Sequence, residues 1–205
     1  MKVIIVGASG KIGRELDRAL SPGHDVVRVG ATRGDVLCDY TDAESVRSMF
    51  EMVGAYDALA AVAGADVRFG PFEGLVDDDY RYGFERKFLS QIRLLSLGRP
   101  TIRDGGSFTF TSGFLTHYPN PYSIATGPIN AAVDTFVQNT APLLPRGIRI
   151  NVVSPAPIVP PGRSAPGVVT AAQCAEFFVQ AINGTMTGQV LHAWGGLPIP
   201  DSTGP

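Results

Sequence analysis

The sequence predicts an α/β fold in which one parallel sheet is covered by helices on both faces. Short apolar runs alternate with segments of helical periodicity almost to the end of the chain, which is typical of doubly wound folds. A glycine-rich turn follows the first run and opens the first helix. The runs with the length and composition of buried strands lie at residues 2–6, 25–29, 36–38, 57–62, 107–111, 148–154 and 189–194. We therefore expect a seven-stranded doubly wound sheet.

The helices between these strands are predicted from apolar spacing and from end signals. Apolar residues repeat at helical intervals over 46–53. A long helix is predicted over 77–97, because three aspartates at its start suit the positive end of the helix dipole. Its predicted inward-facing residues are Phe84, Phe88, Ile92 and Leu95. A proline in the first turn suits a helix over 128–141, and Thr170 with Gln173 caps a last helix that stops at a glycine.

Composition predicts one globular domain over residues 1–205. The chain is 44% hydrophobic and 18% charged, carries a net charge of -2 and has no Lys/Arg run. These values argue against nucleic acid or a membrane surface as a partner and favour a small-molecule substrate. The first apolar run is too short for a signal peptide or a span, so we expect a cytoplasmic protein. Two isolated cysteines and three scattered histidines predict neither a disulfide nor a metal site.

The glycine turn at residues 7–13 reads GASGKIG. Glycines at such a turn let the backbone approach a pyrophosphate, and the helix N-terminus behind them favours an anion. The same spacing occurs in plain tight turns, but here it follows the first strand and opens the first helix. The predicted cofactor-binding residues of this turn are Gly7, Ser9, Gly10, Lys11, Ile12 and Gly13. We therefore expect a dinucleotide site.

The chain after the second strand favours NADP(H) over NAD(H). It lacks the carboxylate that selects NAD and carries Arg33 instead. With Lys11 in the glycine turn, this arginine is a candidate to hold the 2′-phosphate of NADP(H). The alternative is that both are ordinary solvated charges.

These motifs together resemble the short-chain dehydrogenase/reductase family over nearly the full chain. Besides the glycine turn, the resemblance rests on segments 38–42, 61–64, 110–113, 145–155 and 187–196. It implies a Rossmann-like sheet in strand order 3-2-1-4-5-6-7, assembled as a homodimer or homotetramer. It also implies that Asp39 contacts the adenine ring and that Ser112 is the catalytic serine. Further cofactor contacts implied by the resemblance are Ala63, Gly64, Pro155 and Ile158.

The chain departs from this family at the catalytic pair. The family uses a tyrosine to transfer the proton and a lysine four residues later to lower its pKa. Alignment puts Thr126 and Asn130 at these positions, and neither can perform those roles. Tyr122 gives a phenol in a shifted register, but no lysine accompanies it. Lys87 stands roughly where the family carries a structural asparagine. The chain thus resembles a subgroup that keeps the glycine turn and lacks the usual pair.

The candidate catalytic residues are therefore Ser112, Tyr122 and Lys87. Ser112 lies at the carboxyl edge of the fifth strand, where open sheets bind ligands, although a strand-end hydroxyl also caps turns. Lys87 is a candidate to supply the missing positive charge, or is a solvated helix lysine. Tyr118 and His117 are alternatives to Tyr122 as proton donor, and aromatic residues of this loop also serve as pocket walls.

Two hypotheses about function remain at this point. The first is an NADP(H)-binding oxidoreductase that acts on a carbonyl or alcohol and uses an atypical proton donor. The second is a nucleotide-binding protein without redox activity, such as a cyclase, a lyase, a sensor or a partner subunit. The intact cofactor motifs favour the first, and the missing pair favours the second.

Overall fold

A computed structural model describes residues 1–63 and 67–200. Its middle layer is a seven-stranded sheet in the order β3-β2-β1-β4-β5-β6-β9, and every pairing in it is parallel. The strands are β1 (Lys2–Val6), β2 (Asp25–Gly30), β3 (Val36–Leu37), β4 (Tyr56–Ala61), β5 (Ile102–Thr111), β6 (Arg149–Pro155) and β9 (Val190–Ala193). Each predicted strand is present, and the Rossmann-like order is confirmed.

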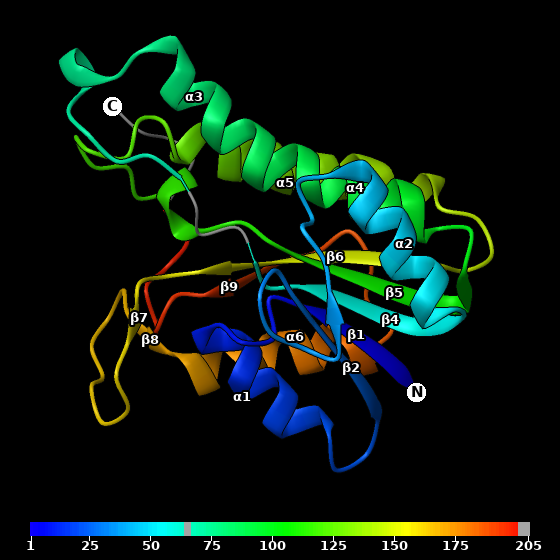
Figure 1. The fold of residues 1–205 in the computed structure, drawn as a ribbon. Helices are drawn as coiled ribbons and strands as arrows, with labels where there is room; N and C mark the ends of the chain where they lie inside the picture. Colours follow the sequence, from blue (N-terminus) through cyan, green and yellow to red (C-terminus); the bar gives the residue numbers. More distant parts are fainter. Residues whose placement is uncertain (64–66, 201–205) are drawn as a thin grey trace.

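Helices cover both faces of the sheet, as Figure 1 shows. One layer holds α2 (Ala43–Val53), α4 (Ser90–Gly98) and α5 (Gly127–Thr140), and the other holds α1 (Lys11–Leu20) and α6 (Ala171–Asn183). The predicted cap of α6 is present, since Thr170 and Gln173 exchange backbone and side-chain hydrogen bonds. Short 3₁₀ turns lie at Phe72–Gly74, Phe114–Thr116 and Ala141–Leu143.

Burial on both faces explains why the central strands are continuously apolar. In β1, Ile4 and Val6 join the core under α2, α4 and α5, whereas Val3 and Ile5 join the core under α1 and α6. All four side chains are at most 1% exposed. A parallel strand covered by helices has no solvent face, so alternation of polar and apolar residues is lost.

The long helix predicted over 77–97 is present, but a π-helical turn interrupts it. The segment runs through α3 (Asp77–Gly83), a π-helix over Phe84–Leu89 and α4. The wider turn changes which side chains face the core. Phe84, predicted to face inward, is 38% exposed, while Lys87 is buried. The extra residue in this turn therefore directs a charged side chain toward the sheet.

The segment that follows β6 is rich in proline and glycine over 155–167. It contains part of a small second sheet, in which β7 (Ile158–Val159) pairs in parallel with β8 (Val169–Thr170). The chain between β7 and β8 extends from the body of the protein beside the start of α1 (Figure 1). This sheet fixes the chain that closes one side of the site described below.

Candidate active site

The glycine turn packs so closely that side chains at two of its glycines would collide with the backbone. Gly7 has φ +91°, and a Cβ there would lie 2.7 Å from the backbone nitrogen of Ala63. A Cβ on Gly13 would lie 2.2 Å from the carbonyl oxygen of Gly7. Gly10, the N-cap of α1, offers no side chain to satisfy the first amides of the helix. The turn therefore presents unpaired N–H groups and a bare backbone surface, which suits a pyrophosphate.

Ser9 connects this turn to the end of β2. A Cβ on Gly30 would lie 3.8 Å from Ser9 Oγ, so the serine hydroxyl faces the turn that follows β2. Arg33 is exposed on that turn, and within the described chain its guanidinium takes part in no ion pair. Arg28 differs, because it pairs with two carboxylates at 2.8 and 3.3 Å. Arg33 is thus the free cation of this turn among the described residues.

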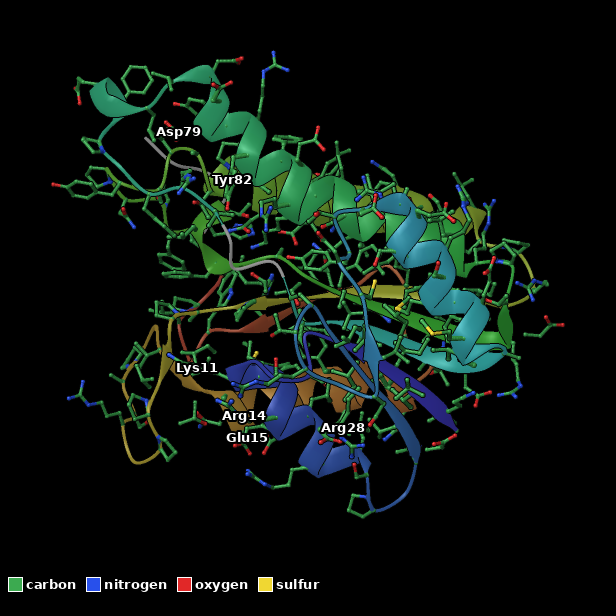
Figure 2. All side chains as sticks on the ribbon, in the orientation of Figure 1. Lys11, Arg14, Glu15, Arg28, Asp79 and Tyr82 are labelled. Atoms are coloured by element: carbon green, nitrogen blue, oxygen red, sulfur yellow. The ribbon has the colours of Figure 1, made fainter. Side chains whose placement is uncertain are left out.

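Lys11 lies at the start of α1, in one cavity with Ile158 and Val159 of β7. Figure 2 shows Lys11 at the end of α1 that faces the β7–β8 segment, while Arg28 lies toward the other end of that helix. Lys11 lines a cavity of about 390 Å³ together with Arg14 and Ile158. The guanidinium of Arg14, which the sequence analysis did not consider, donates to the carbonyl of Ser9 at 2.9 Å. The predicted pairing of Lys11 with Arg33 stays a prediction.

Asp39, a further predicted cofactor contact, is held by the loop that precedes α2. The exposed carboxylate of Asp39 accepts hydrogen bonds from the backbone N–H and the hydroxyl of Thr41, at 2.9 and 2.6 Å. These bonds hold the pKa of Asp39 below its usual value. Gly64 lies outside the described residues.

Lys87 is the buried charge at the centre of the site. Its ammonium donates to the carbonyl oxygen of Ser112 at 2.8 Å and to Oδ1 of Asn130 at 2.7 Å. The side chain is 6% exposed, and burial lowers its pKa to about 8, with the carboxylate of Asp134 acting in the opposite direction. Two of its three ammonium protons have protein acceptors, and the third has none among residues 1–63 and 67–200.

Gln91 fixes the position of Lys87 over the end of β5. Its amide clamps the backbone of Thr111, accepting from the N–H at 2.8 Å and donating to the carbonyl at 3.1 Å. The same amide donates to the carbonyl of Lys87 at 3.0 Å. Neighbouring Gly113 leaves the space that Asn130 occupies, since a Cβ there would lie 2.8 Å from Asn130 Nδ2. These hydrogen bonds therefore fix the position of the π-helical turn relative to the end of β5.

A cavity of about 450 Å³ opens beside Lys87 and Ser112. Ile12 and Ala63 line this cavity on the side of the glycine turn, and Ile158 of β7 lines it as well. Its lining residues are Ile12, Val62, Ala63, Val67, Phe69, Lys87, Thr111, Ser112, Gly113, Phe114, Leu115, Asn120, Thr126, Asn130, Pro155, Ala156, Pro157 and Ile158. The wall is mainly apolar with a small polar group at one end, as is usual for small-molecule sites.

The three loop residues predicted as proton donors do not line this cavity. Tyr122 is 59% exposed and lines a separate hollow with Phe72 and Pro121. The hydroxyl of Tyr118 donates to the carbonyl of Pro198 at 2.5 Å. His117 lines another cavity. Among the predicted catalytic residues, the structure brings together Ser112 and Lys87 but not Tyr122.

Asp134 is a polar residue of the site that sequence reasoning missed. It lies on α5, one turn after Asn130, is 7% exposed, and neither carboxylate oxygen has a hydrogen-bond partner in the described structure. Burial raises its pKa to about 6, and the hydroxyl of Ser112, the charge of Lys87 and the hydroxyl of Thr116 oppose this shift. The Ser112 hydroxyl is buried and equally unpartnered, so the two groups face each other without a hydrogen bond of normal geometry.

Comparison with known proteins decides the family. A family model described as enoyl-(acyl carrier protein) reductase matches residues 11–168. The chain belongs to the short-chain dehydrogenase/reductase family. The curated relative YghA of Escherichia coli (strain K12), described as an uncharacterized oxidoreductase, is 26% identical over 125 residues, which cover 58% of this chain and 42% of that protein. This short-chain dehydrogenase/reductase thus matches less than half of that relative's length.

Two solved structures are similar to this protein over almost the whole chain. Protein lin1944 from Listeria innocua is 32% identical, with a TM-score of 0.88, and the match covers 95% of this chain and 100% of that one. A small-chain dehydrogenase in complex with NADPH is 27% identical, with a TM-score of 0.86 and coverage of 96% and 97%.

Among the helices of residues 1–63 and 67–200, none combines the length and apolar character that crossing a bilayer requires. The same residues contain no group of three or more His, Cys, Asp or Glu side chains arranged to hold a metal ion.

Proposed function

We propose that this short-chain dehydrogenase/reductase is an NADP(H)-dependent oxidoreductase that interconverts a carbonyl and an alcohol, with Lys87 as its proton donor. The observation that carries the proposal is the buried ammonium of Lys87, which lines one cavity with Ser112 and with residues beside the glycine turn. The cofactor side and a charged, proton-bearing group thus meet at the same cavity.

The glycine turn fits a dinucleotide phosphate on steric grounds. Its bare backbone surface and uncapped helix start are the features that a pyrophosphate needs. The similar dehydrogenase described in complex with NADPH supports the same cofactor class here. When bound, the nicotinamide supplies or accepts a hydride. The residues of this chain then have to orient the substrate oxygen and move one proton.

Lys87 and Ser112 are suited to those two tasks. The third ammonium proton of Lys87 has no acceptor among the described residues and is available to a substrate oxygen in the cavity. An ammonium whose pKa is about 8 is a far better acid at neutral pH than an ordinary lysine. The nearby Ser112 hydroxyl, unpartnered in the described structure, gives a second hydrogen bond to orient that oxygen. The donor role of Tyr122 has less support, because Tyr122 lines a separate hollow.

Arg33 is expected to select the phosphorylated cofactor. Replacing Arg33 with alanine removes a charge-assisted hydrogen bond to the 2′-phosphate, which contributes about 1.5–3 kcal/mol. The affinity for NADPH should fall about tenfold or more, while the affinity for NADH, which lacks that phosphate, should not change. Nicotinamide fluorescence titration with both cofactors measures this. Arg47→Ala is the matched control, since Arg47 is an exposed arginine of α2 paired with Glu44. Equal losses for both cofactors would contradict phosphate recognition by Arg33.

The proposed function is tested by titration followed by a substrate panel. Purified protein is titrated with NADPH and NADH, and nicotinamide fluorescence and thermal stability are read together. Small aldehydes, ketones and alcohols are then screened for oxidation of NADPH or reduction of NADP⁺. Tight NADPH binding with turnover of a carbonyl supports the proposal. Tight binding without turnover of any carbonyl or alcohol would reject the redox assignment, and binding of neither cofactor would reject the nucleotide site.

A further inference from the structure

The main cavity, which is the cavity beside Lys87 and Ser112, has one wall without helix or strand. This wall comes from residues 67–71, the wall segment, whose Val67 and Phe69 line the cavity. Phe69 is nevertheless 59% exposed. A large apolar side chain that stays in contact with solvent at the edge of an apolar cavity is a surface that a ligand can cover.

Arg68 attaches the wall segment to α3. Its guanidinium carbon lies 4.1 Å from the ring centroid of Tyr82, and its Nε lies 3.8 Å from Oδ1 of Asp79. Figure 2 shows Asp79 and Tyr82 on the same part of α3, and residues at this spacing share one face of a helix. Arg68 therefore holds one helix face by two contacts, each of which is weak because the side chains are partly exposed to solvent.

Hydrogen bonds tie the backbone of the wall segment to the start of α5 and to the loop before it. The hydroxyl of Thr126 donates to the carbonyl oxygen of Arg68 at 3.1 Å, and the N–H of Gly70 donates to the carbonyl oxygen of Tyr122 at 3.0 Å. Thr126 is 3% exposed and lines the main cavity. At the position that aligns with the family's tyrosine, this chain thus uses a hydroxyl to hold the cavity wall.

The lining of the main cavity indicates which substrates it accepts. Lys87 is the one charged side chain among its described lining residues, and the proposed function uses that charge at the reacting oxygen. The described lining holds no second charge to pair with an ionised group elsewhere on the substrate. The rest of the substrate is therefore expected to be uncharged and apolar, since an unpaired charge is unfavourable in such a cavity.

We propose that Arg68 and Thr126 set the substrate specificity of the enzyme by holding Phe69 in the wall of the main cavity. There Phe69 covers the apolar chain of a carbonyl or alcohol substrate. The inference rests on the proposed function and names its substrate class. Arg68 and Thr126 are positioning residues in it, because they act on the bound chain through Phe69.

The two anchors act through the fraction of molecules in which the wall segment is docked. A ligand that needs Phe69 binds only this fraction, so its apparent affinity falls as the fraction falls. The contact of an exposed arginine with an aromatic ring changes the docking equilibrium about twofold to fivefold, and the Thr126 hydrogen bond changes it about twofold to tenfold. Loss of one anchor should therefore loosen the wall segment, and loss of both should displace Phe69.

The first test measures docking directly and requires no substrate. Hydrogen exchange of the Gly70 amide is followed by NMR in the cofactor-free protein, because that amide donates to the loop before α5. Arg68→Ala should speed this exchange about twofold to fivefold, whereas Arg68→Lys, which keeps a positive charge, should change it less. Arg81→Ala is the matched control, since Arg81 is an exposed arginine of α3 that pairs with Asp77. It should leave the exchange rate unchanged.

The second test measures specificity by binding, without turnover. Hexanol and ethanol are titrated into the protein, and the NMR shift of the Gly113 amide, on the lining of the main cavity, reports binding. Each methylene group that loses its apolar cover lowers affinity about fourfold, so Phe69→Ala should reduce the hexanol-to-ethanol affinity ratio about fivefold or more. The double variant Arg68→Ala, Thr126→Val should reduce this ratio similarly. Phe69→Ala added to the double variant should reduce it little further, because the ring is already displaced.

Conservative variants separate positioning from general damage. Thr126→Ser keeps the hydroxyl that Thr126→Val removes, so it should keep the affinity ratio of the wild type. Phe69 is exposed, so Phe69→Ala tests the wall even if the double variant does not fold.

Each outcome bears on the inference separately from the proposed function. An affinity ratio unchanged in Phe69→Ala would overturn the apolar substrate class. A Gly70 exchange rate unchanged in Arg68→Ala, or a ratio unchanged in the folded double variant, would overturn the role of the anchors. If acetaldehyde is reduced by NADPH but the ratio does not depend on Phe69, the inference fails and the proposed function stands. If the ratio depends on Phe69 and no carbonyl or alcohol is turned over, the proposed function fails and the specificity of the cavity stands.

Discussion

Replacing Lys87 with methionine is expected to lower kcat for carbonyl reduction by about 10²–10⁴-fold, the usual contribution of a general acid. Methionine keeps much of the alkyl chain and removes the ammonium that lines the main cavity with Ser112. NADPH affinity should change little, because the glycine turn and Arg33 are untouched. Steady-state kinetics with cofactor titration separates these two quantities. Arg81→Met, an exposed change on the same helical segment paired only with Asp77 in the described structure, should leave both unchanged.

The pH dependence and a second substitution distinguish proton donation from simple charge stabilisation. The pKa of Lys87 is about 8, so the ammonium is present below pH 8 and lost above it. Reduction should therefore slow as pH rises through about 8. Lys87→Arg keeps a positive charge that does not titrate in this range. If Lys87 is the donor, this variant stays slow at every pH, whereas substantial activity extending above pH 8 would assign Lys87 a purely electrostatic role.

Stability provides a check that the Lys87→Met variant is folded. Removing the ammonium leaves the carbonyl of Ser112 and Oδ1 of Asn130 without this donor, which is unfavourable. It also removes a buried charge, whose desolvation is costly. These effects oppose each other, so a folded variant with a melting temperature within a few degrees of the wild type is expected. Near-normal turnover in such a variant would exclude Lys87 as the proton donor.

The sequence was sufficient for the sheet and the glycine turn because both depend on local patterns. Continuous apolar runs are required of parallel strands that helices cover on both faces, and all seven runs form strands of the sheet. Gly13 must be glycine because of residues close in sequence, since a Cβ there would meet the carbonyl oxygen of Gly7, whereas the contact that requires glycine at position 7 comes from Ala63. Ser112 follows from its place at the end of β5. Each of these features depends on strand position and spacing, which the sequence contains directly.

The centre of the site depends on packing that regular periodicity does not describe. A regular 3.6-residue repeat over 77–97 predicts that Phe84 faces the core. The π-helical turn inserts one residue, so Phe84 is exposed and Lys87 is buried. Asp134 lies between the apolar residues of α5 like any exposed helix polar group, and its burial requires three separate elements to meet. Tyr122 lies outside the main cavity although Asn120 of the same loop lines it, and the direction of a side chain on a loop cannot be inferred from nearness in sequence.

Replacing Gly13 with alanine is expected to weaken NADPH binding at least tenfold and to destabilise the fold by about 1–3 kcal/mol, the usual cost of overpacking. The new Cβ would lie 2.2 Å from the carbonyl oxygen of Gly7 and 2.7 Å from Cα of Ala8. Both are backbone atoms, so the turn must move as a unit. Thermal unfolding and fluorescence titration measure the two effects, with a melting shift of about 2–4 °C for each kcal/mol in a chain of this size.

Gly23→Ala is the matched control for this substitution, because a Cβ there has no atom within 4 Å. It should leave NADPH affinity unchanged and keep or slightly raise stability, since alanine restricts the unfolded chain more than glycine does. The comparison isolates backbone geometry from general effects of a glycine replacement. Several amides of the turn must point at one pyrophosphate together, so a small displacement weakens all of these hydrogen bonds at once. A Gly13→Ala variant that is destabilised but binds NADPH normally would show that the turn supports the fold and does not hold the cofactor.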